Sequence, residues 1–72
     1  MTSHKILLVD DDHDLLEMLL SVFRRAGYTN LLTALSGPEA LRVWRENQPD
    51  LIVLDVMMPG MDGFSVLKEI RR

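Results

Sequence analysis

The 72-residue sequence contains no cysteine, and this absence removes several kinds of site at once. Without thiols the chain can form neither a disulfide framework nor a metal–thiolate centre, and it can carry no thiol redox chemistry. No secretory leader is evident, and no apolar run approaches the roughly 18 residues that a membrane-spanning helix needs. We therefore expect a cytoplasmic protein that makes no contact with a membrane.

Positive charge is also scarce. The chain has 8 lysines and arginines against 11 aspartates and glutamates, and its net charge is -3. The basic residues are scattered rather than gathered into a stripe, which argues against direct binding of nucleic acid. The acids are concentrated, because four of them lie within residues 10–14. A chain of this length makes one small domain, residues 1–72, which buries only about 60% of its unfolded surface.

Two apolar runs that each end in carboxylates are the most informative feature of the chain. Residues 5–9 lead into Asp10 and Asp11, and residues 51–54 lead into Asp55. Short apolar runs rich in β-branched residues are typical of fully buried parallel strands, and open parallel sheets bind ligands outside the carboxyl ends of their strands. If the two runs are neighbouring strands, their carboxylates converge on one pocket. Such carboxylates repel one another unless a cation joins them, so the pattern predicts a divalent metal site.

The next segment of the chain predicts a helix and a weaker strand. The helix extends from Asp12 to Ala26, with Asp12 as its N-cap and Gly27 as its stop. Its apolar residues recur at helical spacing and are expected to face the core: Leu15, Leu16, Met18, Leu19, Val22 and Phe23. Residues 28–34 form the strand candidate.

A second helix is predicted over residues 36–47. Ser36 and Glu39 have the spacing of a capping box, in which each side chain accepts the backbone N–H of the other residue. The inward side chains are expected to be Ala40, Leu41, Val43 and Trp44. Residues 48–50 end this helix, and residues 51–56 form a third strand.

A last helix is predicted to begin at Asp62, with that residue as its cap. It is expected to bury Phe64, Val66, Leu67 and Ile70. The full order is strand–helix, three times. That alternation predicts an α/β fold with right-handed crossovers and a parallel sheet.

Three segments of the sequence resemble the receiver domain of two-component response regulators. They are residues 6–12 (ILLVDDD), residues 34–41 (ALSGPEAL) and, above all, residues 49–63 (PDLIVLDVMMPGMDG). The motifs follow the family's order and spacing, and the resemblance covers essentially the whole chain. It implies a flavodoxin-like fold with strand order 2-1-3-4-5, truncated here to a parallel sheet of order 2-1-3.

The resemblance also implies roles for individual residues. Asp55 matches the phosphoacceptor, which takes a phosphoryl group from a histidine kinase. Asp10 and Asp11 match the acidic pair that binds Mg²⁺ together with Asp55. Met57 matches the position whose backbone carbonyl completes the metal shell. The chain would thus be a substrate in a phosphorelay rather than an enzyme.

The sequence departs from the family in its extent. A receiver has five β-α units, and these residues provide three, so we expect a partial receiver domain. The family's hydroxyl residue and its lysine, which follow the fourth and fifth strands, have no counterpart, and Lys5 and Lys68 do not occupy that lysine's position. We therefore expect weakened Mg²⁺ binding and slow or absent phosphorylation.

An interaction module is the alternative function. With three strands, the apolar run 51–56 becomes a sheet edge, and uncovered edges invite pairing. This predicts a homodimer or higher oligomer, formed by edge pairing or by exchange of elements. The interaction module would then act by self-association or by docking a partner, independently of phosphorylation.

Other functional interpretations fail at single positions. A calcium-binding loop starting at Asp10 would need Gly at position 15 and Glu at position 21, but the chain has Leu15 and Ser21 there. A phosphatase of the haloacid type would need a second Asp where Met57 stands. The remaining polar residues around the acidic run are expected to be solvent-exposed: His4, His13, Asp14 and Glu17.

Overall fold

The computed structural model describes residues 4–55, 60 and 62–71. Strands and helices alternate along them as β1 (Ile6–Val9), α1 (His13–Arg25), β2 (Leu31–Ala34), α2 (Gly37–Asn47), β3 (Leu51–Leu54) and α3 (Gly63–Ile70). The predicted alternation is confirmed. Among the described helices, none is long and apolar enough to cross a bilayer.

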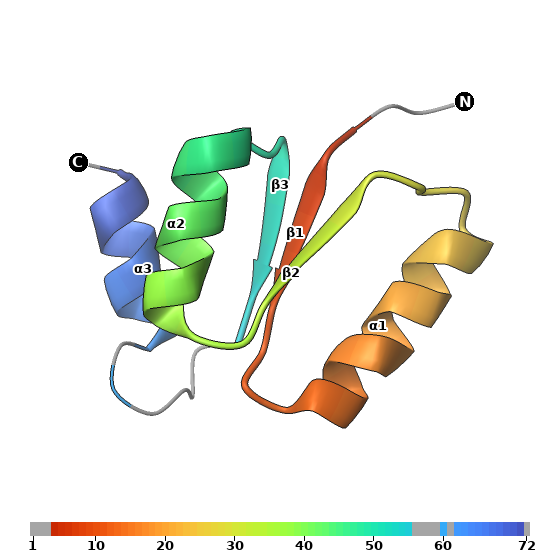
Figure 1. Ribbon diagram of the computed structural model, residues 1–72, viewed down its shortest axis with the longest axis horizontal. Coiled ribbons are helices and arrows are strands. Elements are labelled where there is room, and N and C mark those ends of the chain that lie inside the picture. The colour runs from red at the N-terminus through yellow and green to blue at the C-terminus, as the bar shows by residue number, and fades with distance from the viewer. Residues whose placement is uncertain (1–3, 56–59, 61, 72) are drawn as a thin grey trace.

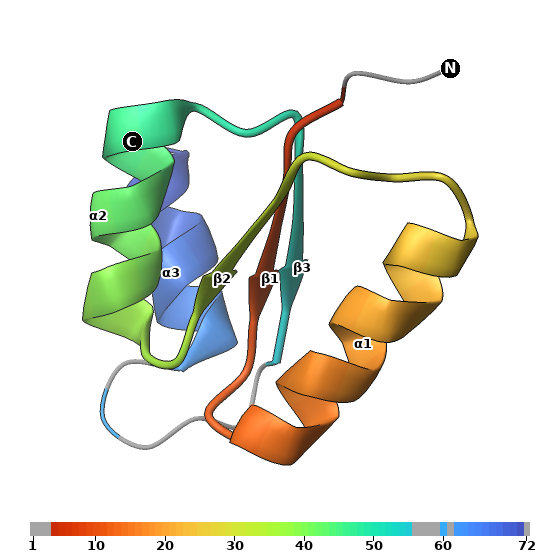
Figure 2. The ribbon, with the colours of Figure 1, turned by 45° about the vertical axis from the view of Figure 1, so that its right-hand side comes forward.

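The three strands form one parallel sheet in the order β2-β1-β3. This is the predicted order, with β1 in the centre. Helix α1 covers one face of the sheet, while α2 and α3 lie side by side on the other (Figures 1 and 2). All three helices begin at the carboxyl edge of the sheet and end at its amino edge, because each follows a strand and returns antiparallel to it.

The central strand divides the core into two clusters. Side chains of a strand alternate between faces, so Leu7 and Val9 point one way while Ile6 and Leu8 point the other. The cluster towards α2 and α3 contains Leu7, Val9, Ala34, Ala40, Leu41, Val43 and Val66. The cluster towards α1 contains Ile6, Leu8, Leu16 and Leu20. Strand β1 is buried along its whole length, as expected.

Strand β3 is less buried than its all-apolar sequence suggests. It pairs with β1 on one side only, and Leu51 keeps 51% of its surface exposed. The expectation of a fully buried strand is therefore wrong for β3, whereas the prediction that this run forms a sheet edge is confirmed for the described sheet. Within the predicted range 51–56, Val56 lies outside the described residues.

Helix α1 has the predicted ends. The Asp12 side chain accepts hydrogen bonds from the backbone N–H groups of Asp14 and Leu15, at 3.0 and 3.2 Å. Gly27 follows with a φ of 100°, and its N–H donates to the carbonyl of Arg24. This left-handed conformation is one that glycine adopts without strain.

The buried face of α1 is narrower than predicted. Leu16 and Leu20 are its buried residues, and Leu20 was not among the expected ones. Met18 and Val22 each remain 55% exposed, and Leu15 is also exposed, so the sequence-based expectation is wrong for these three. A helix that packs on a sheet along one line buries only the residues on that line, whereas the apolar stripe of α1 extends further around the helix.

The second strand is shorter than predicted, starting at Leu31 rather than at Tyr28. Tyr28 instead completes the end of α1: its N–H donates to the carbonyl of Phe23, and the two rings pack with centroids 5.9 Å apart.

Helix α2 begins with half of the predicted capping box. The hydroxyl of Ser36 accepts the N–H of Glu39 at 3.2 Å. The carboxylate of Glu39, however, accepts the N–H of Leu35 at 2.7 Å rather than that of Ser36. The helix ends at Gln48 in a left-handed conformation with a φ of 50°. Its inward side chains are as predicted, with Trp44 half-buried against the core.

Helix α3 is capped by Asp62, whose side chain accepts the N–H of Ser65 at 2.9 Å. Of the four side chains expected to be buried, Val66 is fully enclosed and Ile70 packs against the core. Phe64 and Leu67 are instead 68% and 39% exposed, so the prediction is wrong for these two. Helix α3 lies beside α2 (Figure 1), and only one line of its residues reaches the core.

Candidate functional site

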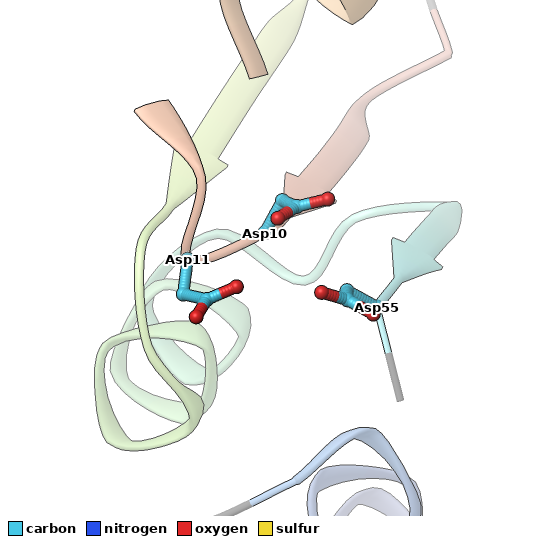
Figure 3. A group of neighbouring side chains, drawn as sticks. All are labelled: Asp10, Asp11 and Asp55. Atoms are coloured by element: carbon cyan, nitrogen blue, oxygen red, sulfur yellow. The ribbon is translucent and has the colours of Figure 1, made fainter. Parts of the chain in front are cut away.

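The candidate site lies where β1 and β3 end. Val9 and Leu54 are register partners in these adjacent parallel strands, so the residues that follow them leave the sheet next to each other. Those residues are Asp10 and Asp55, and Asp11 comes next in the first loop. Figure 3 shows their three carboxyl groups facing a common space at the carboxyl edge of the sheet.

Backbone hydrogen bonds fix the positions of two of these residues. The N–H of Asp10 donates to the carbonyl of Ala34 at 3.2 Å, and the N–H of Asp55 donates to the carbonyl of Val9 at 3.0 Å. Both are continuations of the sheet's hydrogen-bond ladder. Asp10 and Asp55 are therefore held directly at the ends of two paired strands, which position their side chains more rigidly than a free loop does.

Each of the three aspartates offers a carboxylate oxygen, and these oxygens all lie within 4.8 Å of one another. The predicted convergence of Asp10, Asp11 and Asp55 is thus present in the structure. Asp10 is buried, Asp55 is half-buried and Asp11 is exposed, so the group opens to solvent on one side. Oxygen atoms so arranged suit a hard divalent cation such as Mg²⁺.

The electrostatics of the group are set by Asp10, which is only 6% exposed. Burial raises the pKa of its carboxyl group, and the negative charges of Asp55, Asp11 and Asp12 raise it further. The hydrogen bond that its Oδ1 accepts from the N–H of Asp12, at 2.9 Å, opposes the rise in pKa. The pocket thus holds negative charge that a bound cation would offset.

The other residues considered from the sequence are placed elsewhere. Asp12 caps α1, as expected, and does not belong to the group of three. His13 and Asp14 are exposed at the start of the same helix, with Nδ1 and Oδ1 3.9 Å apart. His4 lies at the opposite edge of the sheet, with its Nδ1 3.9 Å from a carboxylate oxygen of Asp50. Met57, the predicted carbonyl ligand, lies outside the described residues.

Comparison with known proteins gives the family. The family model that describes the response regulator receiver domain matches residues 6–72 of the chain. The transcriptional regulatory protein YvrH of Bacillus subtilis (strain 168) is 46% identical over 71 residues. The matched region covers 99% of this chain but 30% of that relative, so the chain spans less than a third of the curated protein.

Solved receiver structures have the same fold. The N-terminal domain of a response regulator receiver protein from Methanoculleus marisnigri JR1 matches with a TM-score of 0.90 and 37% identity, over 97% of this chain and 56% of that one. Response regulator protein TrrA from Thermotoga maritima, crystallised in complex with Mg²⁺ and BeF, matches with a TM-score of 0.89 and 40% identity, over 94% and 58% of the two chains. With its 2-1-3 parallel sheet and a family match that reaches from β1 through α3, the chain belongs to the response regulator receiver domain family.

Proposed function

We propose that Asp55 is the phosphoacceptor of this receiver domain and takes its phosphoryl group from a sensor histidine kinase. The observation that carries the proposal is the grouping of Asp55 with Asp10 and Asp11, whose carboxylate oxygens lie within 4.8 Å of one another. Membership of the receiver family supports the same role. The location of the protein in the cytoplasm stays a prediction, and so does the absence of direct contact with nucleic acid.

The residues present fit Mg²⁺ as the cofactor. Mg²⁺ takes oxygen ligands, binds through few carboxylates and keeps several waters. The three aspartates would supply carboxylate oxygens, and the carbonyl of Met57 stays a predicted ligand. The pKa of Asp10 supports this assignment, because neighbouring carboxylates contribute to its rise and their charge attracts a cation. When bound, the cation would offset negative charge on the transferring phosphoryl group.

In the proposed reaction, a carboxylate oxygen of Asp55 attacks the phosphorus of a phosphohistidine in line with the P–N bond. The new P–O bond forms while the P–N bond breaks, and the imidazole nitrogen keeps the electron pair and is protonated. Asp55 becomes an acyl phosphate. Asp10 and Asp11 form no covalent bond and hold the charged partners of the reaction in place.

We propose that this 72-residue polypeptide is phosphorylated slowly. Its sequence holds no counterpart of the hydroxyl residue and the lysine that follow the family's fourth and fifth strands. Without that lysine, negative charge on the transferring phosphoryl group has less to stabilise it, and a cation held by Asp10, Asp11 and Asp55 would have to supply most of the stabilisation.

Self-association through β3 is the second candidate function. The N–H groups of Leu51 and Asp55 donate to carbonyls at the two ends of β1. Because alternate residues of a parallel strand bond to the same neighbour, the N–H groups of Ile52 and Leu54 face away from β1. These outward N–H groups lie on an all-apolar strand, and they support a homodimer in which the β3 edges of two copies pair with each other. Such a homodimer would not require phosphorylation.

Intact-mass spectrometry after incubation with Mg²⁺ and acetyl phosphate tests the first function. A phosphoryl-sized gain is expected in the parent chain and none in Asp55→Asn, with chelation of Mg²⁺ removing the gain. Asp14→Asn is the matched control, because Asp14 is an exposed aspartate outside the group of three. No gain in the parent, combined with dimers in light scattering, would favour the second function.

A further inference from the structure

The backbone of Asp10 is held towards β2 by the last hydrogen bond of the pairing between β1 and β2. Its N–H donates to the carbonyl of Ala34 at 3.2 Å, whereas the hydrogen bond at the other end of the pairing, from Ile6 to Asn30, measures 3.0 Å. Both strands end here, at Val9 and Ala34, so within the described sheet no further strand pairing supports Asp10 on this side. The position of Asp10 therefore depends on what holds the Ala34 carbonyl.

That carbonyl belongs to a peptide group that is held from its other side by helix α2. The peptide group joins Ala34 to Leu35, and its N–H donates to the carboxylate of Glu39 at 2.7 Å. A hydrogen bond to an ionised group is short and strong, and a peptide group that donates such a bond becomes a better acceptor at its carbonyl. The Glu39 carboxylate thus fixes the orientation of the peptide group whose carbonyl holds Asp10, and it strengthens that carbonyl as an acceptor.

The partner that Glu39 bonds distinguishes it from an ordinary capping residue. In a capping box, a glutamate at the third position of a helix accepts the N–H of the N-cap residue, which in α2 is Ser36. Glu39 instead accepts the N–H of the residue before the cap, Leu35. The hydrogen bond therefore acts on the end of β2, next to the aspartate group, rather than closing the box at the first turn of α2.

The first turn of α2 gives Glu39 a rigid support. Its neighbour Ala40 is fully buried in the core cluster that also contains Val9 and Ala34, so this turn is packed against the strands that it contacts. Ala34 is 1% exposed and Asp10 is 6% exposed, which leaves water little access to the hydrogen bond between them. A hydrogen bond in such surroundings is electrostatically stronger than one in water, and its loss costs more.

We propose that Glu39 is a positioning residue for the aspartate group: through the peptide group between Ala34 and Leu35 it fixes Asp10 in place for a divalent cation. This role rests on the proposed function, in which Asp10 is a ligand of Mg²⁺. Glu39 is not one of the three residues whose carboxylate oxygens converge, so it acts through Asp10 and not on the cation itself. Groups that orient a metal ligand through hydrogen bonds tune the affinity for the metal, and their removal typically lowers it.

Two substitutions of Glu39 distinguish its hydrogen bond from its charge. Glu39→Gln removes the charge but keeps an oxygen that can accept the N–H of Leu35. Glu39→Asp keeps the charge, but its side chain is one methylene shorter, so the hydrogen bond should be lost. In calorimetric titrations with Mg²⁺, the affinity of Glu39→Asp should be roughly three- to tenfold lower than that of the parent, and Glu39→Gln should stay within about twofold of the parent. If the charge of Glu39 acted directly on the cation, the order of the two variants would be reversed, and the proposal would be overturned.

Nuclear magnetic resonance of the 72-residue chain without Mg²⁺ gives a readout that does not depend on the cation. The scalar coupling across the hydrogen bond, between the nitrogen of Asp10 and the carbonyl carbon of Ala34, should decrease in Glu39→Asp and stay near the parent value in Glu39→Gln. The corresponding coupling between Asp55 and Val9 is the internal reference. It should stay unchanged in both variants, because that hydrogen bond lies on the β3 side of β1.

Ser36→Ala is the matched control for a general loss of stability. It removes the 3.2 Å hydrogen bond that caps the same helix, so it should lower the Tm while leaving the Asp10 coupling and the Mg²⁺ affinity unchanged. Should Glu39→Asp unfold by circular dichroism, Glu39→Ala removes the same hydrogen bond and takes its place. Equal Mg²⁺ affinity in this variant and the parent would overturn the role of Glu39 and leave the proposed function standing. A parent that binds no Mg²⁺ would overturn both together.

Discussion

Val9 and Leu54 face each other in adjacent parallel strands, and this pairing places Asp10 beside Asp55 although they are 45 positions apart in the sequence. The two carboxylates meet because each follows the last residue of its strand. A shift of one residue in the register of β3 would move Asp55 away from Asp10 and turn its side chain to the other face of the sheet. The aspartate group therefore depends on the register that the apolar strands enforce.

Asp10→Asn is expected to stabilise the protein against unfolding at neutral pH when no divalent cation is present. Because the pKa of Asp10 is raised in the folded state, the fold binds its proton more tightly than the unfolded chain does, and ionising the group costs stability. That cost is present above the raised pKa and disappears as the pH falls below the ordinary value of 3.8. The asparagine can still accept the N–H of Asp12. Thermal unfolding should show a higher Tm for the variant at neutral pH, with the difference shrinking in acid.

A lower Tm for Asp10→Asn at neutral pH would contradict this account. Mg²⁺ provides the internal control, because a ligand that binds only the folded state raises its stability. The cation should raise the Tm of the parent more than that of the variant, which lacks one of the proposed carboxylate ligands.

Asp12→Ala should destabilise the chain by about 1 kcal/mol through loss of the helix cap, while leaving Mg²⁺ binding largely intact. Its side chain accepts two N–H groups of the first turn of α1, and it lies outside the group of three aspartates. Asp12→Asn is the matched control, because asparagine caps helices equally well. Urea unfolding and calorimetric titration with Mg²⁺ measure the two effects. A large loss of Mg²⁺ affinity in Asp12→Asn would instead make Asp12 a ligand.

The order of the elements and the aspartate group could be predicted from the sequence because both depend on local signals. An apolar run that stops at a carboxylate marks where a strand ends, and adjacent parallel strands end at one edge. Caps behave similarly, since Asp12, Ser36 and Asp62 each bond to an N–H within three residues. In such cases the partner is fixed by the chain's own spacing.

The faces of the helices could not be predicted as well, because they depend on what packs against each helix. The apolar stripe of α1 is wide enough to allow several orientations, and the sheet covers only the line that includes Leu16 and Leu20. Likewise α3 lies against α2, which leaves Phe64 exposed. The hollow at the amino edge of the sheet could not be predicted for the same reason, because it joins Tyr28, expected in a strand, to His4 and Asp50, which lie far away in the sequence.

Leu20→Ala and Met18→Ala should differ strongly in their effect on stability, although both remove large apolar side chains from α1. Leu20 is buried in the cluster between α1 and β1, so its truncation leaves a cavity and should cost about 2–5 kcal/mol. Met18 is mostly exposed, and its truncation should change stability by less than about 0.5 kcal/mol. Alanine favours the helix in both variants, so propensity does not explain a difference. Chemical denaturation measures both, and equal losses would mean that α1 packs through another face.

Mg²⁺ affinity should fall as the pH is lowered, and it should begin to fall at a higher pH than an ordinary aspartate would give. Burial and the neighbouring carboxylates raise the pKa of Asp10, so protons compete with the cation for this ligand at a higher pH than they would for an ordinary aspartate. The direction of this change in affinity follows from the charge of the ligand, because the cation binds the ionised carboxylate and protonation removes its negative charge. Calorimetric titrations at a series of pH values should show weaker binding in acid together with proton release, detected as heats that depend on the buffer.

The variant Asp10→Asn tests which group the protons bind. Its Mg²⁺ binding should be weaker at neutral pH, and the part of the pH dependence that begins above the range of an ordinary aspartate should be absent, because the group that titrates there is gone. An unchanged pH profile in that variant would show that Asp10 is not the group through which protons compete with the cation.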